Sequence, residues 1–99
     1  MFNVLGFYKF TKIRSLKKNK DLLQKFLIAN NIRGTVIIAK EGLNGTISGQ
    51  VTDIEKSTKK IKSIFSFKQF DNSNISKSQF QPFHKPKVKI KKETVPMNL

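Results

Sequence analysis

Residues 35–49 read TVIIAKEGLNGTISG, and this stretch decides the fold. Its β-branched, apolar start at 35–38 is typical of a buried strand. Three glycines and an asparagine follow, residue types that take up positive φ angles in turns at little steric cost. We therefore expect a β-hairpin, with one strand ending at Ala39, a turn through 40–44 and a returning strand at 46–48. Glu41 and Asn44 add polar groups that a simple turn does not need, so this loop is a candidate site.

Hydrophobic patterns on both sides of the hairpin complete one small domain. Residues 3–10 alternate as a strand with apolar side chains on both faces, as in a central strand. Apolar residues spaced three, four and seven apart predict helices over 16–30 and from about 52 to 65, with Ser15 as the N-cap of the first. Residues 71–78 are polar and predict a loop. Residues 87–95 predict the last strand.

The predicted elements follow one another as βαββαβ. With right-handed crossovers, the compact solution for this order is the ferredoxin-like split sandwich, an α+β fold with two helices on one face of an antiparallel sheet. We expect the first and third strands at its centre and the last strand at an edge. The domain should cover residues 1–95, and Pro96 opens what reads as a linker over 96–99.

The composition limits the function. The 99 residues include 20 Lys and Arg against six Asp and Glu, and a net charge of +14 favours polyanionic partners. With no cysteine and only His84 as a histidine, we expect no disulfide, no metal and no thiolate catalysis. No apolar run approaches the ~20 residues that span a bilayer, so we expect a cytoplasmic protein with no membrane partner. The alternative is that the lysines reflect a compositional habit, in a chain also rich in Ile and Asn.

The charges are patterned as well as numerous, which favours nucleic acid. Near the C-terminus the candidate RNA-binding residues form a lysine ladder, comprising Lys85, Lys87, Lys89 and Lys91. Period two places Val88 and Ile90 on the core and the lysines on the opposite face, with successive lysines about 6.6 Å apart, close to phosphate spacing. The alternative role is protection of an edge strand against aggregation, and the two roles are compatible.

A second basic group lies in the loop after the first strand. Lys12 and Arg14 are the candidate RNA-binding residues there, because an arginine can fork onto a phosphate and the N–H groups of the following helix can assist. On the open face of the sheet, Tyr8 and Phe10 could stack on unpaired bases. We expect them instead to pack against other aromatic rings or another domain, the candidate rings being Phe67, Phe80 and Phe83.

Three segments carry a family resemblance. They are AKEGLNGTISG at 39–49, FYKF at 7–10, and Pro82-Phe83 with KVKIKKE at 87–93. In this order they resemble the amino-terminal domain of the rhodanese-domain tRNA uridine hydroxylases. The resemblance implies an acylphosphatase-like form of the ferredoxin-like fold, followed by a rhodanese domain beyond the linker. The full-length enzymes hydroxylate the wobble uridine of certain tRNAs, and their reactive cysteine lies in the rhodanese domain.

We therefore expect a tRNA-binding or substrate-positioning domain with no catalytic residue and no cofactor. Its partners would be tRNA, held by the two basic groups, and the rhodanese domain. The hairpin motif would approach the anticodon region or that domain, and its candidate residues are Lys40, Glu41, Gly42, Asn44 and Gly45.

Two alternatives remain open. The first is a docking module whose charge is incidental. The second is an acylphosphatase-like hydrolase that uses Arg14 and Asn44. Against the hydrolase, residues 10–15 read FTKIRS and lack the glycine-rich phosphate loop of acylphosphatases.

Overall fold

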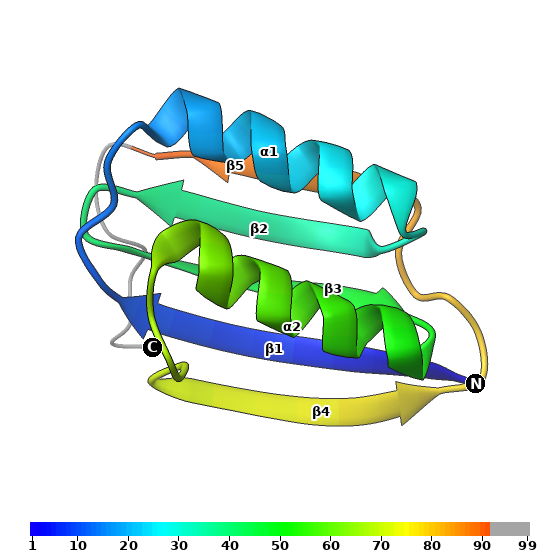
Figure 1. The fold of residues 1–99 in the computed structure, drawn as a ribbon. Coiled ribbons are helices and arrows are strands. Elements are labelled where there is room, and N and C mark those ends of the chain that lie inside the picture. Colours follow the sequence, from blue (N-terminus) through cyan, green and yellow to red (C-terminus); the bar gives the residue numbers. More distant parts are fainter. Residues whose placement is uncertain (92–99) are drawn as a thin grey trace.

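A computed structural model describes residues 1–91, which form one five-stranded sheet with two helices on one face (Figure 1). The elements in chain order are β1 (Phe2–Phe10), α1 (Leu16–Ala29), β2 (Arg33–Ala39), β3 (Gly42–Gly49), α2 (Val51–Phe65), β4 (Asn72–Ser78) and β5 (Pro86–Ile90). The strand order is β4-β1-β3-β2-β5. All neighbouring strands are antiparallel except β2 and β5, which are parallel. This confirms the predicted α+β, ferredoxin-like class.

The core lies between the helices and the sheet. Along β1 the buried side chains of Leu5 and Phe7 point to the helices, whereas Tyr8 points to the open face. Helix α2 covers β1 and β3, and α1 covers β2 and β5 (Figure 1). The fully buried aliphatic side chains that join these layers are Leu23, Leu27, Ile32, Val36, Ile38, Ile47, Ile54 and Ile61. One face of the sheet is thus committed to the core, and the other is partly open to solvent, with Ser48 buried at one end.

One edge of the sheet differs from the sequence prediction and the other agrees with it. Residues 72–78, expected to be a loop, form β4 and pair with β1. The prediction failed because β4 is an edge strand with nearly all its side chains exposed, so it carries no apolar alternation. The final strand, β5, lies at the other edge beside β2, and β3 is the central strand. Residues 92–95 of the predicted last strand and the linker at 96–99 lie outside the described residues.

The hairpin turn is shorter than predicted. Strand β2 ends at Ala39 and β3 begins at Gly42, so only Lys40 and Glu41 form the turn, and Asn44 lies inside β3. A Cβ at Gly45 would lie 2.5 Å from the carbonyl oxygen of Thr35. This motif glycine is therefore required by close backbone approach within the sheet and not by turn geometry. Asn44 is consequently placed opposite Tyr8 and not across the turn from Glu41.

Candidate nucleic-acid interface

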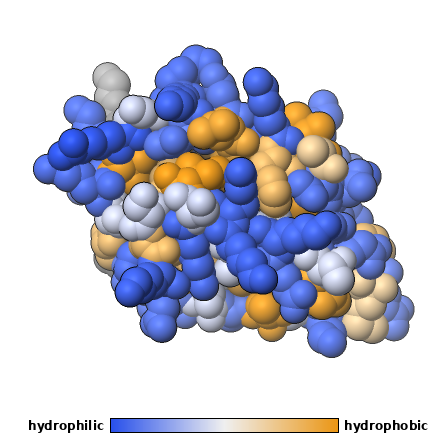
Figure 2. Space-filling view, viewed as in Figure 1, coloured by the Kyte–Doolittle hydropathy of each residue, from blue (hydrophilic) through white to orange (hydrophobic). Residues whose placement is uncertain are grey.

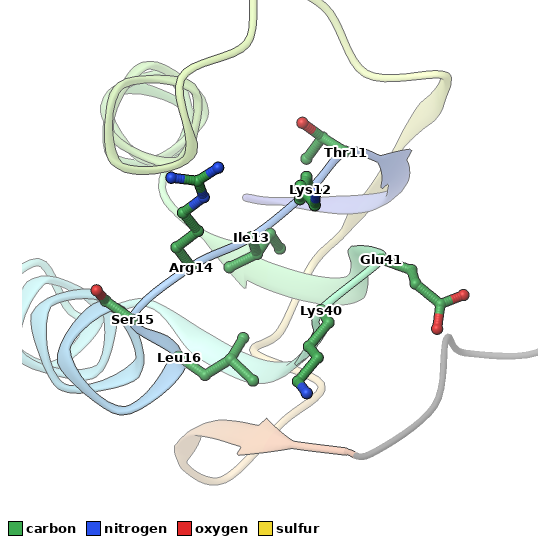
Figure 3. Close-up of a pocket in the computed structure, with 8 residues that line it drawn as sticks. All are labelled: Thr11, Lys12, Ile13, Arg14, Ser15, Leu16, Lys40 and Glu41. Atoms are coloured by element: carbon green, nitrogen blue, oxygen red, sulfur yellow. The ribbon is translucent and has the colours of Figure 1, made fainter.

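The loop after β1 and the hairpin turn meet at one end of the molecule. The N–H of Thr11 donates to the carbonyl of Glu41 (3.1 Å), and the N–H of Ile13 donates to that of Lys40 (2.9 Å). A pocket of about 700 Å³ lies between the two loops (Figure 3). Its lining includes four of the residues singled out from the sequence, Lys12, Arg14, Lys40 and Glu41. The fold thus brings the second basic group, Lys12 and Arg14, together with the hairpin motif.

Arg14 is exposed, and its guanidinium points toward α2 and away from Glu41 (Figure 3). It borders a second pocket, of about 290 Å³, which Lys18 and the end of α2 at Phe65 also line. Within residues 1–91 the guanidinium has no ion pair and no hydrogen bond. All its donors are therefore available for an anion.

Helix α1 begins beside Arg14 without a side-chain cap. Ser15 occupies the N-cap position, as predicted, but its backbone is left-handed (φ 52°, ψ 52°) and its hydroxyl caps nothing. Asn19 donates to the carbonyl of Arg14 (2.8 Å), which holds the loop against the helix. The first turn of α1 contains no acidic residue. Its free N–H groups and their partial positive charge are therefore not neutralised by a carboxylate of the same turn.

The lysine ladder lies along β5, as predicted. Lys87 and Lys89 pair with Thr35 and Ile37 of β2, both on the open face of the sheet. Lys91 follows the strand, and its N–H donates to the carbonyl of Ile38 (2.9 Å). Lys85 lies at the opposite end of β5, where its carbonyl accepts from Gly34 (3.0 Å). All four side chains are exposed, and none has an ion-pair partner within the described part of the chain.

The two apolar residues of β5, Val88 and Ile90, differ in how deeply they are buried. Val88 is buried under α1, as predicted, but Ile90 is 39% exposed. Ile90 faces the helix side beside Ile38, as its period predicted, but its burial is incomplete because it lies at the end of an edge strand.

A side chain of α1 occupies the outer edge of β5. Gln24 donates from Nε2 to the carbonyl of Pro86 (2.9 Å) and accepts at Oε1 from the N–H of Val88 (2.8 Å). Part of the edge is therefore protected by a glutamine, while Lys87 and Lys89 point to the open face. Edge protection alone thus explains less of the lysine ladder than the sequence suggested.

The predicted ring partners of Tyr8 and Phe10 are not found within residues 1–91, and packing against another domain stays a prediction. Phe67 and Phe70 stack near Phe7 on the helix side, with ring centroids 5.3 Å apart for Phe67 and Phe70 and 4.9 Å for Phe7 and Phe70. Tyr8 and Phe10 therefore do not lie under Phe67, because they occupy the other face of the sheet. Within residues 1–91, each forms a ring pair only with the other.

Positive charge is not confined to one face. Figure 2 shows the helix-bearing side, where hydrophilic side chains cover much of both helices and hydrophobic ones are visible between them. Lysines of α1 and α2 contribute to this surface, but so do three acids, Asp21, Asp53 and Glu55. The strand residues that face the open side include Arg33, Lys87 and Lys89 and no acid. The difference between the two faces lies in the distribution of the acids.

The two residues of the hydrolase alternative, Arg14 and Asn44, do not lie together. Asn44 faces the open side of the sheet beside Tyr8. Arg14 points to α2 on the other side (Figure 3), so the pair does not converge on one substrate. Among residues 1–91 no group of three His, Cys, Asp or Glu side chains could hold a metal ion. Neither helix in that range is long and apolar enough to span a membrane.

Fold and site together define a ferredoxin-like α+β domain whose exposed functional groups are basic, aromatic and amide side chains. Residues 2–94 match the family described as the UPF0176 acylphosphatase-like domain. The chain belongs to this family.

Curated relatives carry longer chains. Over 99 residues the chain is 68% identical to the tRNA uridine(34) hydroxylase of Pelagibacter ubique, covering all of this chain and 33% of the relative. It is 35% identical to the tRNA uridine(34) hydroxylase of Ehrlichia ruminantium, covering 93% of this chain and 34% of the relative. The chain therefore spans about a third of these relatives, whose names place the family in tRNA modification.

Solved structures confirm the fold at low identity. Acylphosphatase from Bacillus subtilis has a TM-score of 0.62 at 10% identity, with 89% of this chain and 98% of that chain covered. The BLUF protein BlrP1 has a TM-score of 0.68 at 13% identity, with 93% and 65% covered. Full-length HypF, in a phosphate- and nucleotide-bound form, has a TM-score of 0.63 at 18% identity, with 97% and 13% covered. At these identities the likeness concerns the fold alone.

Proposed function

We propose that this chain is a tRNA-binding, substrate-positioning domain of a tRNA wobble-uridine hydroxylase. The relatives named tRNA uridine(34) hydroxylase support the context, and the chain corresponds to about a third of their length. In this proposal a rhodanese domain of the same protein carries out the hydroxylation. The chain described here holds and orients the tRNA in the cytoplasm.

The observation that carries the proposal is the set of cations without partners at two places. Arg14 projects beside the uncapped start of α1, and the ladder lysines project from β5. None of these side chains forms an ion pair within the described residues. Cations that the protein itself does not neutralise release counterions from RNA phosphates on binding, and such contacts orient the RNA without reading its sequence.

In this proposal the hairpin turn makes a further contact, separate from the phosphate contacts of the basic side chains. Lys40 and Glu41 are exposed, at the rim of the 700 Å³ pocket, and backbone hydrogen bonds to Thr11 and Ile13 hold the turn in place. A rigid, exposed turn beside Arg14 suits a contact with the anticodon region or with the rhodanese domain. Gly42 and Gly45 support it structurally through the close packing of β3.

Binding of fluorescently labelled tRNA to the 99-residue chain tests the proposal. Replacing Lys12 and Arg14 with alanine should weaken binding about tenfold, because two charge-assisted contacts are lost. Replacing Lys56 and Lys59, exposed on α2, removes the same charge and should have a much smaller effect. Equal effects of the two double variants, or no tRNA binding by the unaltered chain, would contradict the proposal.

The hydrolase alternative has a direct test. The chain should not hydrolyse an acyl phosphate, because Arg14 and Asn44 lie on opposite sides of the sheet. Turnover that is abolished by Arg14→Ala would restore that alternative.

The docking alternative has a different test. It would be supported if the chain binds a rhodanese domain stably but does not bind tRNA.

A further inference from the structure

An aromatic pair lies on the open face of the sheet, with Tyr8 half-buried and Phe10 exposed. The rings of Tyr8 and Phe10 meet edge to face, with centroids 6.1 Å apart and an interplanar angle of 70°. Phe10 is 50% exposed although its strand lies inside the sheet. An apolar ring held open to water on a rigid strand is a candidate stacking platform for a planar ligand.

Amide and hydroxyl groups flank this pair. In the sheet register, Tyr8 lies between Asn72 of β4 and Asn44 of β3. In the next row, Gly6 lies between Asn74 and Thr46. A Cβ at Gly6 would be 3.4 Å from Oδ1 of Asn74 and 3.9 Å from Oγ1 of Thr46, so the missing side chain leaves these two groups on either side of a small hollow.

The flanking polar groups are available to a ligand. Within residues 1–91 the side chains of Asn44, Thr46, Asn72 and Asn74 form no hydrogen bond. Asparagine presents both a donor and an acceptor, the combination that the edge of a nucleobase requires. At the other end of this face Ser48 is buried and hydrogen-bonded to Gln81, so the accessible half is the one around Tyr8 and Phe10.

The same two rows end in lysines. The row of Tyr8 and Asn44 continues through Ile37 to Lys89, and the row of Thr46 continues through Thr35 to Lys87. Three strand spacings, about 14 Å, separate β1 from β5. No acidic side chain lies among the strand residues on this face. A ligand that reaches from the aromatic pair to Lys87 and Lys89 must therefore carry planar groups at one end and negative charge at the other. These two features must be separated by more than the length of one nucleotide.

We propose that this face binds unpaired nucleotides of RNA, with a base stacked on Tyr8 and Phe10 and the backbone leading to Lys87 and Lys89. The proposal rests on the proposed function and adds to it a second mode of contact, since phosphate binding alone does not need the aromatic pair. A paired helix hides its base faces, so the ligand is a single-stranded segment.

Tyr8 provides a direct probe, because the chain contains one tyrosine and no tryptophan. Its fluorescence should be quenched when the 99-residue chain is titrated with a short single-stranded oligouridine. An RNA duplex of equal length carries phosphates but no open bases, and it should bind without comparable quenching.

Substitutions separate stacking from charge. Tyr8→Leu and Phe10→Leu should each weaken binding of the oligouridine by about 5- to 150-fold, the range for loss of one base–aromatic stack. Tyr8→Phe keeps the ring and should bind within about twofold of the unaltered chain, which guards against a folding defect in Tyr8→Leu. Phe80→Leu is the matched control, because Phe80 is 70% exposed on the connection between β4 and β5 and should not affect binding.

The outcomes distinguish this inference from the proposed function. If tRNA binds in a lysine-dependent way but neither leucine variant weakens oligouridine binding, stacking is wrong and the proposed function stands. If neither RNA binds, both are wrong. If Tyr8 fluorescence changes with protein concentration alone and sedimentation shows a dimer, the face binds a second copy of the chain, and the inference is overturned.

Discussion

At the scale of single residues, the hairpin motif brings the backbones of β2 and β3 too close for a side chain at Gly45. Its glycines suggested a long turn, but Gly45 lies inside β3, where the backbone of β2 leaves no room for a Cβ. Turn propensity and close backbone approach both favour glycine, so the residue type alone does not separate them. The position of Asn44 on the open face follows from this shorter turn.

Gly45→Ala should lower the free energy of unfolding by about 2–4 kcal/mol, because its Cβ would press on the carbonyl of Thr35 and the Cα of Val36. The matched control is Gly6→Ala, whose nearest neighbour is the flexible side chain of Asn74 at 3.4 Å. That change should alter stability by no more than about 1 kcal/mol. Urea denaturation measures both, and equal destabilisation would contradict the packing argument.

Asp71 joins the end of β1 to the start of β4. The N–H of Phe10 donates to its Oδ2 (2.6 Å), and this bond, aided by Lys9, lowers the pKa of Asp71 below its ordinary 3.8. A lowered folded-state pKa contributes stability above the unfolded value, and that contribution is lost as pH falls through the folded pKa. Asp71→Asn should therefore be less stable than the unaltered chain at pH 7, and the difference should shrink at an acidic pH below the ordinary pKa of 3.8. Denaturation midpoints at both pH values check this, and a constant difference would contradict it.

At the scale of elements, the amphipathic elements were predictable and the exposed one was not. Both helices and the strands β1 to β3 carry apolar residues at the period of their structure, because each has a face on the core. Strand β4 has no such face. Its position depends on tertiary contacts that the sequence does not display, namely the pairing with β1 and the packing of Phe70 against Phe7.

The contact between α1 and β5 is a second feature that the sequence did not reveal. Gln24→Leu should lower the free energy of unfolding by about 1–3 kcal/mol, because the N–H of Val88 and the carbonyl of Pro86 lose their partner. It should also promote association through the uncovered edge. Lys25→Leu, at the neighbouring exposed position, is the control and should change stability by less than about 0.5 kcal/mol. Thermal denaturation and light scattering measure the two effects, and indistinguishable variants would refute the proposed role of Gln24.

At the scale of the whole molecule, charge and fold have to be considered together. The net charge of +14 predicted a polyanionic partner but could not say which face meets it. The fold places three of the six acids on the helices and none among the strand residues that face the open side. The period of two in the sequence was enough to predict the lysine ladder. The position of Arg14 beside the hairpin turn could not be predicted, because it depends on how the loop after β1 runs across the end of the sheet.

The most direct test of the central claim is the salt dependence of tRNA binding to the 99-residue chain. Replacing Lys87, Lys89 and Lys91 with alanine should reduce the slope of log affinity against log salt by about 2 to 3, because each lost phosphate contact removes about 0.7–0.9. Replacing the exposed lysines Lys56, Lys59 and Lys68 removes equal charge and should change the slope by clearly less. An unaltered slope in the β5 variant, or the same change in both variants, would contradict the account.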